Sequence, residues 1–257
     1  MRNNDQKKII ITGGPTNEPI DEVMKITNMS TGSLSVNLTN LFLDAGWQVC
    51  LVLNNGVSAE KLKIQDASTQ RQNHLKLVRV ETTDEMLSVL EAESKQAAYD
   101  VVIHASAVGD YKAAFSFLLE DLAEELFANK DCFKSAEDIL KMMENPKCKL
   151  DDSSKISSYQ KNLTVKLGLT PKIIARLREW YPNSILIGCK LLESVPKEEL
   201  YEVSSKLCSK NDMDYILAND LAELKSGIQT RYLVTKIGFT GIKLEAPHDI
   251  FDFVSNL

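Results

Sequence analysis

Short apolar runs alternate along the chain with longer segments in which apolar residues recur about every 3.6 positions. The runs predict buried strands, and the periodic segments predict helices. The expected strands are 8–11, 48–53, 77–80, 101–105, 185–188 and 215–218, the expected helices are 32–45, 83–97, 171–180 and 197–210, and a hairpin at 231–242 and a closing helix at 249–256 follow. This alternation predicts an α/β, Rossmann-like fold, with a mostly parallel sheet and helices on both faces.

The alternation breaks at about residues 111–160. This segment carries an acidic, helix-like stretch at 118–126 and a polar run at 151–154. We interpret it as a flap-like insertion within a single domain that spans residues 1–257. A long irregular segment can be a functional lid or a disordered loop, and the pattern alone favours neither.

The composition limits the classes of function. The chain has 257 residues, of which 44% are hydrophobic, enough for one large core. Its formal net charge of −6 argues against generic binding to nucleic acid or to an anionic membrane, because both need a basic surface.

The five cysteines show no C-x-x-C pair, which is typical of reduced thiols rather than of a zinc site or a disulfide framework. A polar N terminus and the lack of an apolar run of about 18 residues argue against a signal peptide or a membrane helix, so we expect a cytoplasmic protein.

Two polar turns near the start of the chain carry the most specific pattern. Gly13 and Gly14 follow the first predicted strand, where glycines permit a left-handed backbone and the close approach of a ligand. Neither the dinucleotide fingerprint G-x-G-x-x-G nor the phosphate loop G-x-x-x-x-G-K-[ST] is present. In the second turn, we expect Ser30 and Thr31 to cap the following helix and to leave amide N–H groups for an anion. Asn28 precedes that helix end, where an asparagine can also simply stabilise a turn.

The carboxyl ends of parallel strands are the usual place for a ligand in an α/β sheet. The residues expected there are Gly13, Ser106, Asp110, Cys189 and Asn219. Asp110 offers a carboxylate that could accept hydrogen bonds from a base or a ribose, although an aspartate in this place can also cap a helix. His104 lies within an apolar strand without a partner histidine at metal spacing, so we interpret it as a hydrogen-bonded core residue.

Several motifs occur in an order that resembles one enzyme family. They are G-G-P-T-N-E-P-I-D at 13–21, T-N-M-S-T-G at 27–32, A-S-A-V-G-D-Y at 105–111, K-I-S-S at 155–158, T-P-K-I-I at 170–174, K-x-x-x-K-N at 206–211 and A-N-D at 218–220. Together they resemble phosphopantothenoylcysteine synthetase, the phosphopantothenate-cysteine ligase of coenzyme A biosynthesis, in its stand-alone bacterial form. The resemblance spans nearly the whole chain.

The resemblance implies a two-step ligation. The carboxylate of 4'-phosphopantothenate attacks the α-phosphate of a nucleoside triphosphate, and the amine of L-cysteine then displaces the nucleotide. CTP is expected rather than ATP, with an acyl-cytidylate intermediate, and Mg²⁺ is expected to offset the repulsion between the anionic groups. The family is typically a homodimer. Because the first predicted strand begins at Lys8, we expect a separate phosphopantothenoylcysteine decarboxylase as a partner.

The same resemblance assigns the site residues. Asn28 and Lys155 are expected to be catalytic, Asn28 because a neutral amide can donate to a developing oxyanion and Lys155 as a cation for the phosphates. Nucleotide binding is assigned to Gly13, Gly14, Ser106, Asp110, Pro171, Lys172, Ile173, Ile174, Cys189, Lys206, Lys210 and Asn219. No protein ligand is assigned to a metal. Lys206 and Lys210 lie four residues apart on one helix face and could reach one phosphate chain, although such a pair can also be a solvated surface stripe.

The chain departs from the family pattern in ways that leave alternatives open. Met24 stands where the family usually carries arginine, Ser33 where lysine is frequent, and Cys189 where an aromatic residue packs against the base, while Ser157 and Ser158 replace two lysines. The leading hypothesis is an active ligase. The alternative is a catalytically degenerate member that acts as a binding or regulatory partner. Strand-helix alternation would also suit a short-chain dehydrogenase, but the glycine fingerprint of that class is absent.

Overall fold

The computed structural model describes residues 6–62, 69–152 and 154–257. These residues form two compact units. The first unit combines Met1–Thr16, Asn28–Val108 and Pro171–Leu257, and the second combines Asn17–Thr27 and Gly109–Thr170. The segment that the sequence predicts to be an insertion falls within the second unit. The polar N terminus, residues 1–5, and Ser153 of the polar run lie outside the described residues.

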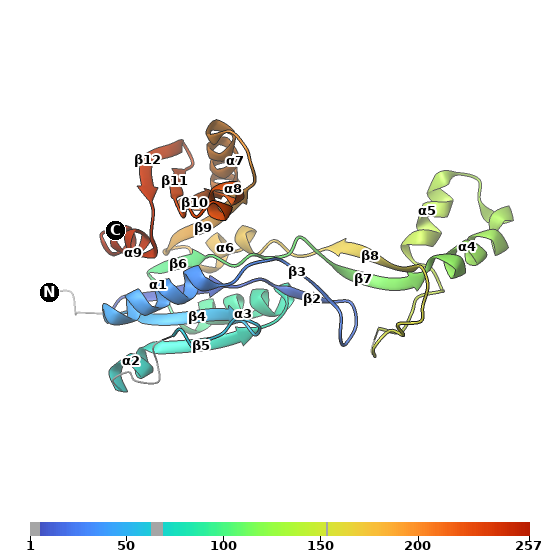
Figure 1. Cartoon of the computed structure of the whole chain (residues 1–257), viewed down its shortest axis with the longest axis horizontal. Helices are drawn as coiled ribbons and strands as arrows, with labels where there is room; N and C mark the ends of the chain where they lie inside the picture. Colours follow the sequence, from blue (N-terminus) through green and yellow to red (C-terminus); the bar gives the residue numbers. More distant parts are fainter. Residues whose placement is uncertain (1–5, 63–68, 153) are drawn as a thin grey trace. The chain divides into compact units, whose positions relative to one another are not determined.

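The first unit is built on an eight-stranded sheet with the order β12-β11-β10-β9-β6-β1-β4-β5 (Figure 1). Its strands are β1 (Lys8–Gly13), β4 (Gln48–Asn54), β5 (Leu75–Val80), β6 (Val101–His104), β9 (Ile185–Leu192), β10 (Tyr215–Asp220), β11 (Arg231–Thr235) and β12 (Gly238–Leu244). Neighbouring strands from β10 to β5 are parallel, and β11 and β12 add an antiparallel edge. Each strand expected from an apolar run occurs, and the Rossmann-like fold class is confirmed.

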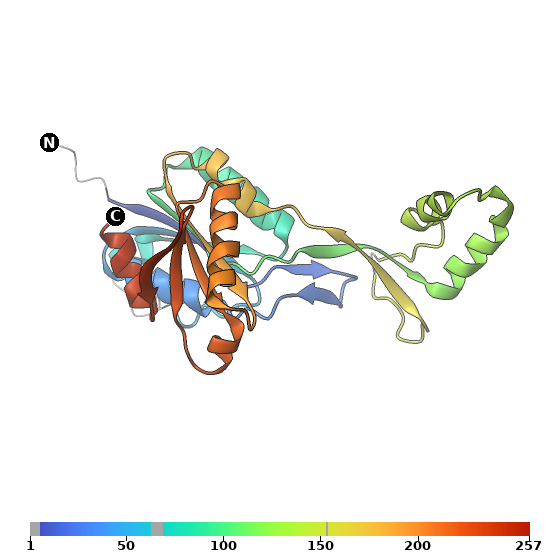
Figure 2. The same ribbon diagram turned by 90° about the horizontal axis from the view of Figure 1, so that it is seen from above.

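Helices cover both faces of this sheet (Figure 2). One face carries α1 (Ser33–Asp44) and α9 (Pro247–Ser255), the other carries α3 (Thr83–Gln96), α6 (Leu177–Trp180) and α7 (Lys197–Lys210), and α2 (Thr69–His74) and α8 (Leu221–Lys225) are shorter elements. In β1, Ile9 and Ile11 belong to the core under α1, whereas Ile10 belongs to the core under α3. All three side chains are fully buried, which explains why this strand is a continuous apolar run.

Residues 171–180 do not form one helix, contrary to the prediction. A 3₁₀ turn, η2 (Ile173–Ala175), precedes the single turn of α6, and Lys172 keeps an extended backbone. Ile173 and Leu177 are both buried in the core. Tertiary packing, rather than helical periodicity, therefore determines the path of this segment.

The second unit contains two pairs of antiparallel strands and the helices α4 and α5. Its antiparallel strand pairs are β2 (Asn17–Pro19) with β3 (Lys25–Thr27), and β7 (Tyr111–Leu118) with β8 (Leu163–Leu169). Between β7 and β8 the chain forms α4 (Leu119–Ala128), η1 (Lys130–Cys132) and α5 (Ala136–Glu144). α4 matches the stretch predicted to be helical, but β7 and β8 replace the irregular structure expected around it. Each of these strands pairs with residues far away in the sequence, so no local pattern indicates the pairing.

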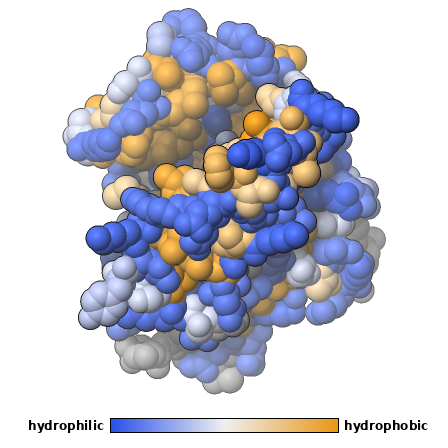
Figure 3. Space-filling model, turned by 90° about the vertical axis from the view of Figure 1, so that its right-hand side faces the viewer, coloured by the Kyte–Doolittle hydropathy of each residue, from blue (hydrophilic) through white to orange (hydrophobic). Residues whose placement is uncertain are grey.

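The core of the second unit is small. Phe115, Phe117 and Leu122 form its buried apolar cluster. α5 has no buried residue, and Leu140 and Met143 on it are exposed. Figure 3 shows hydrophobic surface beside hydrophilic surface on the side where Figure 1 draws α4 and α5. Within the described ranges, no helix is long and apolar enough to cross a membrane.

Candidate functional site

The carboxyl ends of β1 and β6 meet where the strand order reverses. In the sheet, β4 and β5 lie on one side of β1, and β6 begins the other side. The loops after the two strands are joined, because Ala107 N donates to Gly14 O at 2.9 Å and Thr16 N donates to Ala107 O at 3.3 Å. Pro15 also forms a bridge with Ala107. Such a switch point is the usual ligand site of an open α/β sheet, so the candidate site is built around these two loops.

Gly13 has a packing role that the sequence pattern does not reveal. A Cβ atom on Gly13 would lie 1.8 Å from Ser35 Oγ, so the missing side chain lets α1 pack directly on the end of β1. Gly14 differs, since it has φ +80° and an added Cβ would lie 2.7 Å from Val57. The left-handed turn expected for both glycines therefore occurs at Gly14 and not at Gly13.

Asn28 lies at the switch point. It is exposed, and its Nδ2 donates to Ala107 O at 3.0 Å. The helix that follows is not capped as expected, because Gly32 is the N-cap of α1 with φ 69° and no side chain caps the helix. Thr31 Oγ1 accepts only a long bond of 3.4 Å from the first helical N–H. Ser30 and Thr31 are thus not the caps, since the chain enters α1 through a left-handed glycine at the N-cap itself.

A buried polar pair supports the loop after β6. Thr12 Oγ1 lies 2.9 Å from Nδ1 of His104, and both residues are buried. Ser106 N donates to the same Thr12 hydroxyl at 3.2 Å. His104 is therefore a hydrogen-bonded core residue, as the sequence predicts. Ser106 Oγ is buried and has no hydrogen-bond partner in the described part of the chain, which is uncommon for a buried hydroxyl.

His104 makes the stability of the fold depend on pH. Burial lowers its pKa from the ordinary 6.5 to about 4. Between these values the unfolded chain binds a proton that the folded protein does not, so the free energy of unfolding falls as the pH drops, by up to about 3 kcal/mol. Urea titrations at a series of pH values should show this loss, and the loss should be smaller by about the same amount in His104→Gln. Exposed His248 is the matched control, because His248→Gln should keep the wild-type dependence. A His104→Gln protein with the wild-type dependence would contradict this assignment.

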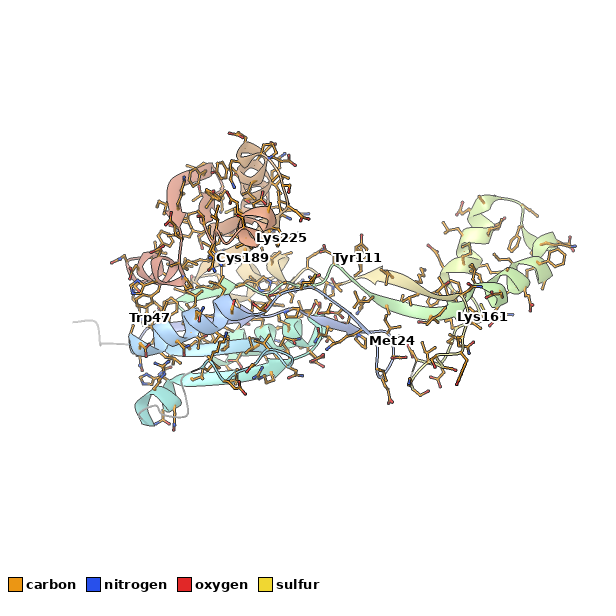
Figure 4. The ribbon with its side chains drawn as sticks, in the orientation of Figure 1. Met24, Trp47, Tyr111, Lys161, Cys189 and Lys225 are labelled. Carbon is orange, nitrogen blue, oxygen red and sulfur yellow. The ribbon has the colours of Figure 1, made fainter. Side chains whose placement is uncertain are left out.

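A second group of predicted residues lies on the neighbouring strands β9 and β10, with Asn219 near the carboxyl end of β10 and Cys189 three residues before the end of β9. Cys189 is half-buried on β9 (Figure 4), and burial raises the pKa of its thiol to about 11 against the opposing effect of the nearby Arg231. Ala218 pairs with Tyr232 across the antiparallel β10 and β11. The next residues along these strands, Asn219 and Arg231, therefore lie opposite each other at this edge of the sheet.

Arg231 is a cation that the sequence pattern does not reveal as a site residue. It is half-buried, burial lowers its pKa, and its Nη1 donates to Gln229 O at 2.9 Å. Among residues 6–62, 69–152 and 154–257, no carboxylate forms an ion pair with it. A guanidinium in this state is suited to a phosphate or to the acceptors of a base. In the sequence, only its place at the start of a predicted hairpin is visible.

Asp110 does not lie where the sequence predicts. β6 ends at His104, and Asp110 directly precedes β7 in the second unit. Asp110 is exposed, and its backbone carbonyl accepts a hydrogen bond from Thr170 N at 3.1 Å. Both interpretations of Asp110 from the sequence, a carboxylate at a strand end and a helix cap, are wrong. The chain leaves the sheet before Asp110, and a strand of the second unit follows it.

The predicted nucleotide segment after β8 is used largely for packing. Ile173 is buried in the core, and an added Cβ on Gly188 would lie 3.1 Å from Ile174 Cδ1. The Ile173 side chain therefore belongs to the core, and the half-buried Ile174 lies close to Gly188 on β9, while the assignment of both residues to nucleotide binding stays a prediction. Pro171 is half-buried and Lys172 is exposed.

Lys206 and Lys210 lie at the opposite end of the sheet from Asn219. They belong to the last turns of α7 and, with Lys236 of the β11–β12 turn, they line a surface hollow of about 740 Å³. This turn lies beside the amino end of β10, because β11 is antiparallel to β10. Lys206 forms an ion pair with Glu202. The two lysines do not meet the strand-end residues as expected, because α7 runs back along the sheet between the parallel β9 and β10.

In the second unit, the carboxylate of Asp21 binds three backbone N–H groups. Oδ1 accepts from Val23 N at 2.7 Å and from Met24 N at 2.6 Å, and Oδ2 accepts from Ile156 N at 2.8 Å. Lys155, the predicted catalytic lysine, is exposed and precedes Ile156 in the chain. Met24 is exposed beside β3 (Figure 4). The Asp21 carboxylate therefore connects the segment that carries Lys155 and Ile156 to the β2–β3 turn.

A protein-only metal site is not formed by the residues that the structure describes. Among them, no three His, Cys, Asp or Glu side chains cluster so that they could hold a metal ion. Mg²⁺ is commonly bound through one or two carboxylates together with substrate phosphates and water.

Two known proteins similar to this chain are named for the biosynthesis of coenzyme A. Coenzyme A biosynthesis bifunctional protein CoaBC from Thermococcus kodakarensis is 28% identical over 215 residues, which cover 84% of this chain and 41% of that protein. The protein of the same name from Methanocaldococcus jannaschii is 25% identical over 257 residues, with 97% and 51% covered. The chain thus spans about half the length, or less, of these relatives.

The solved structures and the family pattern agree with the motifs. The structure of a DNA/pantothenate metabolism flavoprotein from Streptococcus pneumoniae is 28% identical, with a TM-score of 0.75 over 97% of both chains. The pattern of the DNA/pantothenate metabolism flavoprotein C-terminal domain matches residues 4–146, more than half of this chain. The resemblance expected from the motifs is confirmed. This chain belongs to the family of DNA/pantothenate metabolism flavoprotein C-terminal domains.

Proposed function

We propose that this chain is a phosphopantothenate-cysteine ligase, which joins 4'-phosphopantothenate to L-cysteine through an acyl-nucleotide. Membership of the family supports this function, and the curated relatives are named for coenzyme A biosynthesis. The observation that carries the proposal is the group at the switch point. There, exposed Asn28 donates from Nδ2 to Ala107 O, and Ala107 N donates to the carbonyl of Gly14, which has a left-handed backbone. The backbone N–H of Ser106, whose hydroxyl is buried, donates to the Thr12 hydroxyl.

The ligation needs a donor for charge that develops on the acyl group. First, a carboxylate oxygen of phosphopantothenate bonds to the α-phosphorus of the nucleotide, and the bond to pyrophosphate breaks. The cysteine nitrogen then bonds to the acyl carbon, nucleoside monophosphate leaves and the amine loses a proton. A preorganised neutral donor stabilises the acyl oxygen in the second step. We assign this role to Asn28, whose Nδ2 already donates to a carbonyl oxygen at 3.0 Å and could exchange it for the substrate oxygen.

The nucleotide is proposed to bind along the carboxyl edge of the sheet. Gly14 and Ser106 would contact it from the loops after β1 and β6, and Asn219 from the end of β10. This places the nucleotide away from the hollow at Lys206 and Lys210, which we reassign to the solvated surface. Gly13 is reassigned to packing, because Ser35 occupies the space beside it.

The remaining assignments are carried over from the family resemblance. Lys155 is proposed as the cation for the reacting phosphates, and CTP is proposed as the nucleotide rather than ATP. Magnesium would enter with the triphosphate and reduce its charge. A homodimer, a separate decarboxylase as partner and a cytoplasmic location also stay proposals.

Arg231 is expected to set the affinity for the nucleotide. Arg231→Ala should raise the KM for CTP about tenfold and leave kcat within about twofold, because a hydrogen bond from a charged group is lost equally from the ground and transition states. Arg231→Lys should have a KM for CTP between those of the wild type and Arg231→Ala, since lysine keeps the charge but lacks the planar guanidinium group. Steady-state kinetics would check this, with Arg176→Ala, at an exposed arginine paired with Glu179, as the control. An unchanged KM in Arg231→Ala would remove Arg231 from the site.

A degenerate family member is the second candidate, and Met24 and Cys189 favour it. Met24 carries no charge, and burial keeps the Cys189 thiol neutral, so neither can replace an arginine or an aromatic ring. Such a protein would bind CTP without releasing pyrophosphate, and the double variant Met24→Arg, Cys189→Phe would gain activity. Turnover by the unmodified chain would exclude this candidate.

The proposed function is tested by pyrophosphate release from the purified chain with Mg²⁺ and either CTP or ATP. Release is expected only when 4'-phosphopantothenate is present. Pyrophosphate that appears without phosphopantothenate would count against a ligase.

A further inference from the structure

The turn at Asp21 has the geometry of an anchor for a distant segment. Asp21 is only 6% exposed, and its two carboxylate oxygens accept three backbone N–H groups. Two of them, from Val23 and Met24, close the β2–β3 turn itself. The third, from Ile156, comes from 135 positions further along the chain. A carboxylate that closes its own turn needs no such partner, so the third bond serves the distant segment.

Ile156 is held at two points. Its N–H donates to Asp21, and its side chain is buried, with 8% exposed. Lys155 before it and Tyr159 after it are exposed. Residues 154–160 belong to no described helix or strand. Their backbone therefore has no regular ladder of hydrogen bonds, and the segment depends on contacts of this kind for its position.

The chemistry of the anchor requires a carboxylate. A carboxylate only accepts hydrogen bonds and has two oxygens to do so, whereas an asparagine has one oxygen and one donor NH₂ group. The N–H groups of Met24, Ile156 and Val23 lower the pKa of Asp21, and the Lys155 ammonium adds to this effect. Asp21 is thus ionised at neutral pH, and it can hold Ile156 and the turn together.

We propose that Asp21 is a positioning residue for Lys155: its carboxylate fixes the Ile156 backbone to the β2–β3 turn and so determines where the neighbouring ammonium group can reach. The inference rests on the proposed function, in which Lys155 is the cation for the phosphates of a nucleoside triphosphate. Asp21 itself contacts no substrate. Its effect on the reaction passes through the position of Lys155.

Hydrogen exchange at the Ile156 amide of the whole chain tests the anchor directly. Asp21→Asn should speed this exchange at least about tenfold, while the amides of β1 keep their wild-type rates. Asp249→Asn is the matched control, because Asp249 also accepts two local N–H groups, from Glu245 and Ala246, at the start of α9. Unchanged exchange in Asp21→Asn would overturn the anchor. If this variant does not fold, exchange is measured in the unmodified protein instead. An Ile156 amide that exchanges there without protection at neutral pH would also overturn the anchor.

Kinetics separate positioning from a merely structural role. Asp21→Asn should lower kcat for pyrophosphate release about tenfold, and Lys155→Ala should lower it by at least as much. The double variant should be no slower than Lys155→Ala, because Asp21 acts only through that lysine. If the fold losses in kcat of the two single variants multiplied in the double variant, the proposal would be overturned. A wild-type protein without turnover would defeat the proposed function instead, and the exchange measurement would still decide whether Asp21 holds the segment.

Discussion

Asn28→Ala is expected to lower kcat for ligation by about 10²- to 10³-fold, with a much smaller change in KM. The reason is that the amide donates to charge that appears only as the acyl carbon is attacked. The variant also loses the bond from Nδ2 to Ala107 O, which should cost about 1 kcal/mol of stability and leave the fold intact. Single-turnover measurements with CTP and phosphopantothenate, with cysteine added last, would show the slow step.

Asn40→Ala is the matched control for this experiment. Asn40 lies on α1, and its Nδ2 donates to Lys61 O at 2.8 Å, so a similar bond is lost away from the switch point. Its kcat should equal that of the wild type. Asn28→Asp should be at least as slow as Asn28→Ala, because it replaces a donor with a negative charge. A kcat within about threefold of the wild type in Asn28→Ala would show that this residue has no part in stabilising the transition state.

Gly13→Ala is expected to destabilise the fold by at least about 4 kcal/mol, which is at the upper end of the range for a single substitution. The added Cβ would lie 1.8 Å from Ser35 Oγ and 2.4 Å from Ser35 Cβ, so α1 would have to move away from β1. Urea unfolding followed by circular dichroism would measure the loss. Gly168→Ala is the control, because its Cβ would make only an ordinary contact of 3.7 Å with Ala114, and its change should stay within about 0.5 kcal/mol.

A second substitution tests whether the contact with Ser35 is the cause. Ser35→Gly alone should cost about 1 kcal/mol, because glycine is a poor helix former. In the Gly13→Ala background, Ser35→Gly should instead recover more than half of the lost stability, since it removes both atoms that the new methyl group meets. Simple addition of the two losses would mean that Gly13 is needed for another reason.

The strands of the first unit could be predicted because they are buried on both faces. A segment such as Ile9–Ile11 needs apolar side chains at every position, and this leaves a run that local sequence shows directly. α7 spans 197–210 as predicted, because its apolar residues face the sheet at helical spacing. β7 and β8 could not be predicted in this way, because each has its partner far along the chain, β7 has only three buried residues and β8 has none.

The candidate site was only partly predictable, for a related reason. The motifs around Asn28 and Ser106 identify residues that the fold brings together at the switch point. Spacing alone could place Lys206 and Lys210 on one face of a helix, but not at a given end of the sheet, which depends on the direction in which α7 runs. The bond from Ile156 to a carboxylate 135 positions away leaves no local pattern at all.

The most direct test of the proposed function is the product formed by the unmodified chain. Purified protein would be mixed with Mg²⁺, 4'-phosphopantothenate, CTP and L-cysteine, and pyrophosphate and the new amide would be measured together. We expect one amide for each pyrophosphate, with CTP giving faster turnover than ATP. A folded protein that binds CTP but releases no pyrophosphate with either nucleotide would contradict the ligase and favour a degenerate binding partner.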